Sequence, residues 1–176
     1  RGFVAQLAGG WQRSRYRTDL RGGHFTTDQQ EYLNNWAIQG TLFIPVIPTT
    51  TANLAGTAAL TVQAYVGQGL DFIGNGTGMN HILHFHPNRL DRHLVKTWGG
   101  YVQANYYFSN QWFLNVAAGL GSNFDVDTYT DVAASTRPVH HWWEVSPALY
   151  YRPISAVKFG LQYTYTRANY YRMFTY

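Results

Sequence analysis

The regular alternation of polar and apolar side chains over Lys96–Phe108 constrains the fold more than any other feature. The even positions from Trp98 to Phe108 are Trp, Gly, Val, Ala, Tyr and Phe, and the odd positions between them are mostly polar. Successive side chains of a β-strand point to opposite faces, so the segment predicts a strand with one apolar face. Aromatic ends around a middle of small residues are typical of a transmembrane strand with interfacial girdles. We therefore expect an outer-membrane β-barrel.

The same alternation recurs along the whole chain. Strands are expected at 3–11, 32–44, 60–71, 96–108, 112–120, 141–152 and 157–166. Pro45 and Pro48 are expected to end the second of them, and Pro147 counts against the sixth, because proline has no N–H to give to a ladder. The connections alternate between long and short, which predicts an all-β, antiparallel, up-and-down meander with every long loop at one end, as in transmembrane barrels.

Seven strands are an odd number, whereas bacterial single-chain barrels have an even number. Two interpretations remain open. An eighth strand could lie at 79–85, or residues 1–176 could be one domain that is incomplete at both ends and belongs to a larger barrel. The second interpretation fits better, because the chain begins inside a strand and stops where a final strand should begin.

Composition agrees with a barrel whose polar groups face inward. Only 12% of the 176 residues are charged and 17% are aromatic, against about 25% charged in an average soluble domain. No run of about 18 apolar residues exists, which excludes helical spans. Without cysteine there is no disulfide and no thiolate metal site. The net charge of +4 does not indicate nucleic-acid binding, because the densest arginine stretch (13, 15, 17 and 21) follows an aromatic strand. We expect this stretch to start an extracellular loop, where the cations could pair with lipid phosphates.

Alternation divides the strand residues into two predicted sets. The outward aromatics are expected to form membrane girdles: Trp11, Trp36, Trp98, Tyr106, Phe108, Trp112, Trp143, Tyr151, Tyr163 and Tyr165. The inward polar residues are expected to line a pore: Arg152, Lys158, Glu144, Asp71, Gln103, Asn105, Asn115 and Gln162. Arg152 and Lys158 flank one short turn, and cationic rings favour anions. Two interpretations of these cations remain open. They could give the pore a mild preference for anions, or they could only hydrogen-bond to neighbouring groups in the lumen.

Two strand pairs resemble those of Gram-negative trimeric porins. One is Gly99-Gly100-Tyr101-Val102-Gln103-Ala104-Asn105-Tyr106-Tyr107-Phe108 with Trp112–Gly121 after a short turn, and the other is Tyr150-Tyr151-Arg152-Pro153 leading to Val157–Tyr163, which is similar to DcaP-like porins. The resemblance implies a homotrimer of many-stranded barrels in the bacterial outer membrane, in contact with lipid and lipopolysaccharide, that passes small hydrophilic solutes. A porin normally closes with a final strand ending in Phe, and none follows Tyr165.

Other chemistry is weakly indicated. Histidines at 81, 84, 86 and 93 could bind a transition metal, but no carboxylates stand at defined spacing. The acidic residues Asp125, Asp127 and Asp131 lack the spacing of a calcium loop. Ser146, His140 and Glu144 share a strand face, yet no nucleophile-elbow motif frames the serine. We expect no catalysis, no metal and no cofactor, and keep three alternatives: a non-conducting structural barrel, an outer-membrane hydrolase and a soluble β-sandwich.

Overall fold

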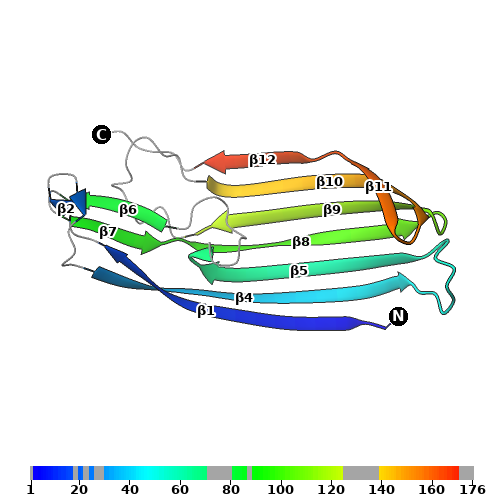
Figure 1. Cartoon of the computed structure of the whole chain (residues 1–176), viewed down its shortest axis with the longest axis horizontal. Coiled ribbons are helices and arrows are strands. Elements are labelled where there is room, and N and C mark those ends of the chain that lie inside the picture. The colour runs from blue at the N-terminus through cyan, green and yellow to red at the C-terminus, as the bar shows by residue number, and fades with distance from the viewer. Residues whose placement is uncertain are drawn as a thin grey trace.

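The computed structural model describes residues 2–17, 20–21, 24–25, 30–70, 81–86, 89–124 and 139–170, and it is all-β in these residues. Its main element is an eight-stranded antiparallel sheet in up-and-down order, β1-β4-β5-β8-β9-β10-β11, in which β12 also pairs with β10 (Figure 1). The strands are β1 Val4–Arg17, β4 Gln30–Ile47, β5 Ala58–Gln68, β8 Lys96–Tyr107, β9 Trp112–Asn123, β10 Val139–Ile154, β11 Val157–Gln162 and β12 Tyr165–Tyr170.

All seven predicted strands are present, but their ends differ from the prediction. β1 continues beyond Trp11 to Arg17, paired with β4 along its whole length, so Arg13 and Arg15 are strand residues and not the start of a loop. β4 continues past Pro45 to Ile47 through a shift of register, and it ends only before Pro48. A missing N–H at a bulge costs no regular ladder bond, which explains why Pro45 does not end the strand.

Pro147 lies inside β10, opposite Val116 of β9, so the predicted sixth strand is confirmed despite the proline. The Pro147 carbonyl accepts a hydrogen bond from the Tyr163 N–H at 3.0 Å. In an antiparallel pair the same residue would also donate its N–H to this neighbour, and proline cannot. The missing bond coincides with the interruption between β11 and β12. These two segments keep one register against β10 and together form the seventh line of the sheet.

The region proposed to hide an eighth strand does contain one, but outside the main sheet. β6 (His81–His86) pairs with β7 (Arg89–Leu94) in a separate two-stranded sheet, and β7 leads directly into β8. A shorter pair, β2 (Leu20–Arg21) with β3 (His24–Phe25), lies at the same end of the molecule (Figure 1). The short connections 48–57, 108–111 and 155–156 gather at the opposite end, as the alternation of loop lengths predicts.

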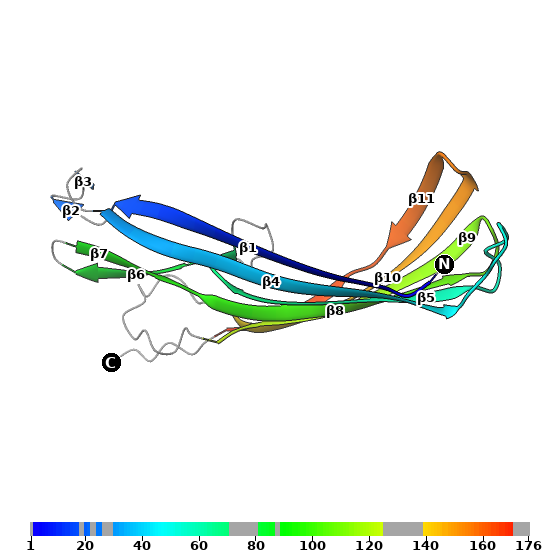
Figure 2. The ribbon, with the colours of Figure 1, turned by 90° about the horizontal axis from the view of Figure 1, so that it is seen from below.

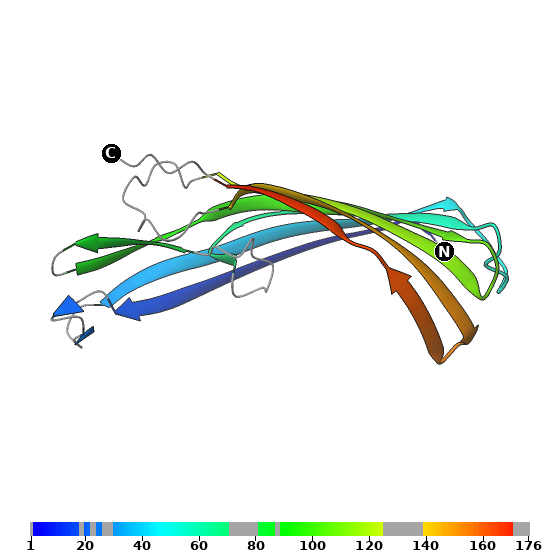
Figure 3. The same ribbon diagram turned by 90° about the horizontal axis from the view of Figure 1, so that it is seen from above.

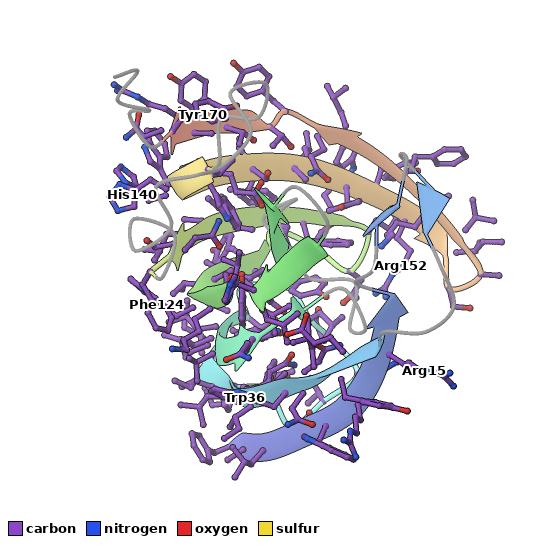
Figure 4. All side chains as sticks on the ribbon, turned by 90° about the vertical axis from the view of Figure 1, so that its left-hand side faces the viewer. Arg15, Trp36, Phe124, His140, Arg152 and Tyr170 are labelled. Carbon is purple, nitrogen blue, oxygen red and sulfur yellow. The ribbon has the colours of Figure 1, made fainter. Side chains whose placement is uncertain are left out.

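The sheet is long, bent and open. Side views show the strands curving along their length (Figures 2 and 3). Viewed along the strands, the sheet forms an arc, with Arg152 on its inner side and Arg15 on its outer side (Figure 4). β1 and the β11–β12 line are the two edges, and they do not pair with each other. We refer to the two surfaces of the arc as the inner face and the outer face.

Candidate functional site

The outer face is apolar across every line of the sheet. Residues directly opposite each other in the ladders share a face, and they form rows that cross from β1 to β12. One such row is Ala5, Leu42, Val62, Val102, Ala118, Val145 and Tyr165. Large apolar side chains on this face are exposed, as shown by Leu7 at 82% and Leu161 at 80% of their accessible surface. A broad exposed apolar surface marks a binding or membrane surface.

The inner face is polar and much more enclosed. The buried residues on this side are the polar Asn35, Thr97, Asn123 and Ser146, with Asn123 fully inaccessible, and the apolar Ala37, Phe113 and Ala148. The described members of the predicted pore-lining set all lie here: Glu144, Arg152, Lys158, Gln103, Asn105, Asn115 and Gln162. Asp71 lies outside the described residues.

Side chains on the inner face hydrogen-bond across strands. The Asn115 amide donates to Asn105 Oδ1 at 2.8 Å, and these two residues are direct partners between β9 and β8. The Ser146 hydroxyl is 2.9 Å from Thr164 Oγ1, which also accepts a bond from the Gln162 amide at 3.1 Å. These contacts give the inner face a fixed lining of amides and hydroxyls.

Aromatic rings on the inner face lie over glycines of the adjacent strand. The directly paired residues are Tyr65 with Gly99, Trp142 with Gly121, and Tyr150 with Gly160. At each glycine the nearest atom to an added Cβ would belong to the aromatic side chain of its partner. A ring lying over a glycine fixes the pairing of two strands, and glycine permits the local bend that a closing sheet needs. This pairing of an aromatic ring with a glycine occurs at three places across the sheet.

Both described inner-face Lys and Arg side chains lie at the end with short connections. Arg152 donates to the Asn110 carbonyl at 3.2 Å, and Asn110 Oδ1 accepts the N–H of Leu54 at 2.6 Å. Lys158 Nζ lies 4.7 Å from the centre of the Tyr150 ring. Arg152 also borders an open hollow of about 450 Å³, lined by residues of the inner face and of the 48–57 connection. Its guanidinium is thus held at the turn-end mouth of the inner face.

The outer-face aromatics follow an oblique line, not a row. Relative to the row through Val102, Trp11 lies six residues toward the long loops, Trp98 four, Trp143 two, and Tyr165 none. The line therefore falls by six residues over the six strand spacings from β1 to β12. The strand ends at the short turns shift in the same direction. β5 starts at Ala58, which lies in the same cross-strand row as Leu149, whereas β10 continues beyond that row to Ile154.

A second group of aromatics lies near the short turns. Trp112 stacks on Tyr151 with ring centres 4.6 Å apart, and Tyr106 meets Phe108 edge-on at 5.2 Å. Trp36 faces Trp11 in the loop-side group. Of the predicted girdle, only Tyr163 belongs to neither group, since it pairs with Pro147 in the middle of β10.

The structure does not assemble the candidate hydrolytic residues. Ser146 bonds to Thr164, and six residues of extended strand separate it from His140, about 20 Å at ~3.3 Å per residue. Glu144 is opposite Thr166 and Gly119. The residues whose side chains are described contain no group of three or more potential metal ligands. The side chains of His81, His84 and His86, and the whole segment with Asp125, Asp127 and Asp131, lie outside what is described.

Comparison with family models, with curated proteins and with solved structures finds no match to this chain. In the described part of the molecule no helix is long and apolar enough to cross a membrane. The sheet and its two faces are therefore the basis for a functional assignment.

Proposed function

We propose that this chain forms part of a transmembrane β-barrel of the bacterial outer membrane, a porin that passes small hydrophilic solutes. The observation that carries the proposal is the division of one curved sheet into an exposed apolar outer face and an enclosed polar inner face. In water the outer face would be a severe aggregation hazard, whereas in a bilayer it is the lipid-facing band.

The oblique aromatic line supports a tilted strand in a membrane. A shift of one residue, about 3.3 Å, for each strand spacing of about 4.8 Å corresponds to a tilt of roughly 35°. Barrel strands tilt by about 35–45°. Trp98 and Tyr106 are eight residues apart on β8, which is about 26 Å along the strand and about 22 Å along the membrane normal at this tilt. The apolar band of outer-membrane barrels is about 25 Å tall.

The inner face suits water and polar solutes. Its side-chain amides and hydroxyls hydrogen-bond across neighbouring strands, as at Asn115 with Asn105 and at Ser146 with Thr164. The interior of a transmembrane barrel that conducts is lined by polar groups of this kind.

Arg152 and Lys158 give this lumen a mild anion preference in the proposal. They are the described Lys and Arg side chains of the inner face, and no ion pair joins either of them to a described carboxylate. Cations at a pore mouth raise the local concentration of anions. The porin resemblance adds the proposal of a homotrimer.

The test is single-channel recording in a planar bilayer with a salt gradient. We expect stepwise conductance, and a reversal potential of the sign for anion selectivity that shifts toward zero in R152Q/K158Q. The matched variant Q103N/Q162N, which changes inner-face side chains without changing charge, should keep the original reversal potential. Absence of conductance from folded, inserted protein would leave the non-conducting structural barrel as the better function, and cation selectivity would refute the anion preference.

A further inference from the structure

Four lines of the sheet carry a basic side chain two residues beyond the loop-side aromatic, on the same outer face. The pairs are Trp11 with Arg13, Trp98 with Lys96, Trp143 with His141, and Tyr165 with Arg167. Arg15 extends the series by one more step on β1. We call Arg13, Arg15, Lys96, His141 and Arg167 the basic collar.

The collar follows the same oblique line as the aromatics. Because each of the four basic residues lies two positions from its aromatic, the four share the same average slope, a fall of six residues over six strand spacings. On a sheet tilted by about 35° this line is level with the membrane plane. The basic residues, which are far apart in sequence, therefore lie at one height, just outside the aromatic girdle.

The charge of the outer face is one-sided. The acidic residues whose side chains the structure describes, Glu31 and Glu144, both lie on the inner face. Near the short turns the described outer-face residues are apolar or aromatic, including Tyr106, Trp112 and Leu161. The outer face thus carries described Lys and Arg side chains at the loop end and none at the turn end.

Individual collar residues are arranged to reach outward. The Arg13 guanidinium lies 4.4 Å from the centre of the Tyr32 ring, and Arg13, Arg15 and Arg167 are exposed (Figure 4 for Arg15). His141 is hydrogen-bonded to Asn169 of β12. Stacking on an aromatic ring orients a guanidinium while leaving N–H donors for a second partner, and guanidinium recognises phosphate with paired N–H donors.

We propose that the basic collar binds phosphate groups of the lipid headgroups in the loop-side leaflet, which in the outer membrane are the phosphates of lipid A. This inference rests on the proposed function, because it needs the outer face to be in a membrane. Basic residues next to a membrane-embedded segment attract anionic headgroups, and the one-sided charge matches a bilayer with its phosphate-rich leaflet on the loop side.

The test measures binding of diphosphoryl lipid A to the full, folded chain in zwitterionic detergent micelles by calorimetry, with dephosphorylated lipid A and inorganic phosphate as comparison ligands. Variant R13Q/R167Q removes two collar cations, and the matched variant R152Q/K158Q removes two cations from the inner face. Each surface cation strengthens binding to an anionic headgroup layer about fivefold, so R13Q/R167Q should weaken lipid A binding about 30-fold. The inner-face variant should stay within about threefold of the parent. R13K/R167K should retain most of the affinity, which separates charge from packing.

Equal binding of dephosphorylated lipid A would overturn the proposal, and so would an equal loss in both double variants or equal binding of inorganic phosphate. Conductance in neutral phosphatidylcholine bilayers separates this proposal from the proposed function. If the protein conducts but binds both forms of lipid A equally, the phosphate-binding role of the basic collar is refuted and the porin function is not. Phosphate-dependent lipid A binding by a protein that inserts but never conducts would refute the porin function and support the collar.

Discussion

Val102 is the position at which the two faces of the sheet can be tested most sharply. It lies on the outer face of β8, four residues from Trp98 and four from Tyr106, and it is 45% exposed. Four residues span about 13 Å of strand, or about 11 Å along the membrane normal at a tilt of roughly 35°, so Val102 lies at the centre of the proposed apolar band. An arginine on the lipid face at the bilayer midplane costs about 2–4 kcal/mol. V102R should therefore shift the unfolding equilibrium about 30- to 900-fold.

The assay is reversible urea unfolding of the protein in phosphatidylcholine vesicles, with stability extrapolated linearly to zero denaturant. The neighbouring variant Q103R places the same side chain on the inner face and should change stability by less than about 1 kcal/mol, since substitutions facing a lumen are tolerated. If Val102 instead faced water, arginine there would fall within the ±0.5 kcal/mol or so usual for exposed sites. That result, or equal costs for V102R and Q103R, would refute the assignment of the faces.

Two further predictions concern the sheet itself. G99A should destabilise the protein by about 1–3 kcal/mol, because its Cβ would lie 2.6 Å from the Tyr65 hydroxyl and 2.8 Å from the Leu120 carbonyl oxygen. G40A, which meets nothing within 4 Å, should stay within about 0.5 kcal/mol in the same unfolding assay, and equal effects of the two variants would contradict the close packing over Gly99. P147V should supply the missing N–H to Tyr163 and stabilise the edge by up to about 1 kcal/mol; hydrogen exchange should then show a protected amide at 147, and an unprotected one would contradict this explanation of the interruption between β11 and β12.

The strands were predictable because their signal is local. Alternation around Val102 or Leu114 specifies a strand and its outward face without knowledge of any partner. The end of β1 was not predictable in this way, since beyond Trp11 both faces carry polar residues, and only pairing with β4 shows that the strand continues to Arg17. The continuation of β4 past Pro45 was not predictable for a similar reason, because a bulge depends on the partner strand.

The alignment of residues on different strands was harder to predict from the sequence. Arg13, Lys96 and Arg167 are 71 residues or more apart, and they share one height only once the offset between strands is known. Register follows from the cross-strand pairs, which a single sequence does not display. A local signal did exist, since each of these residues stands two positions from an outward aromatic. The oblique arrangement of the aromatics had to come from the structure.

The most direct test of the two-faced sheet is an accessibility scan of β8. The protein has no cysteine, so single cysteines at each position from 98 to 106 can carry a spin label without further changes. In vesicles, labels at even positions should be accessible to oxygen dissolved in the lipid, and labels at odd positions to a water-soluble nickel reagent, with a period of two residues. A scan without alternation, or with even positions accessible to the nickel reagent, would contradict the placement of the outer face in lipid.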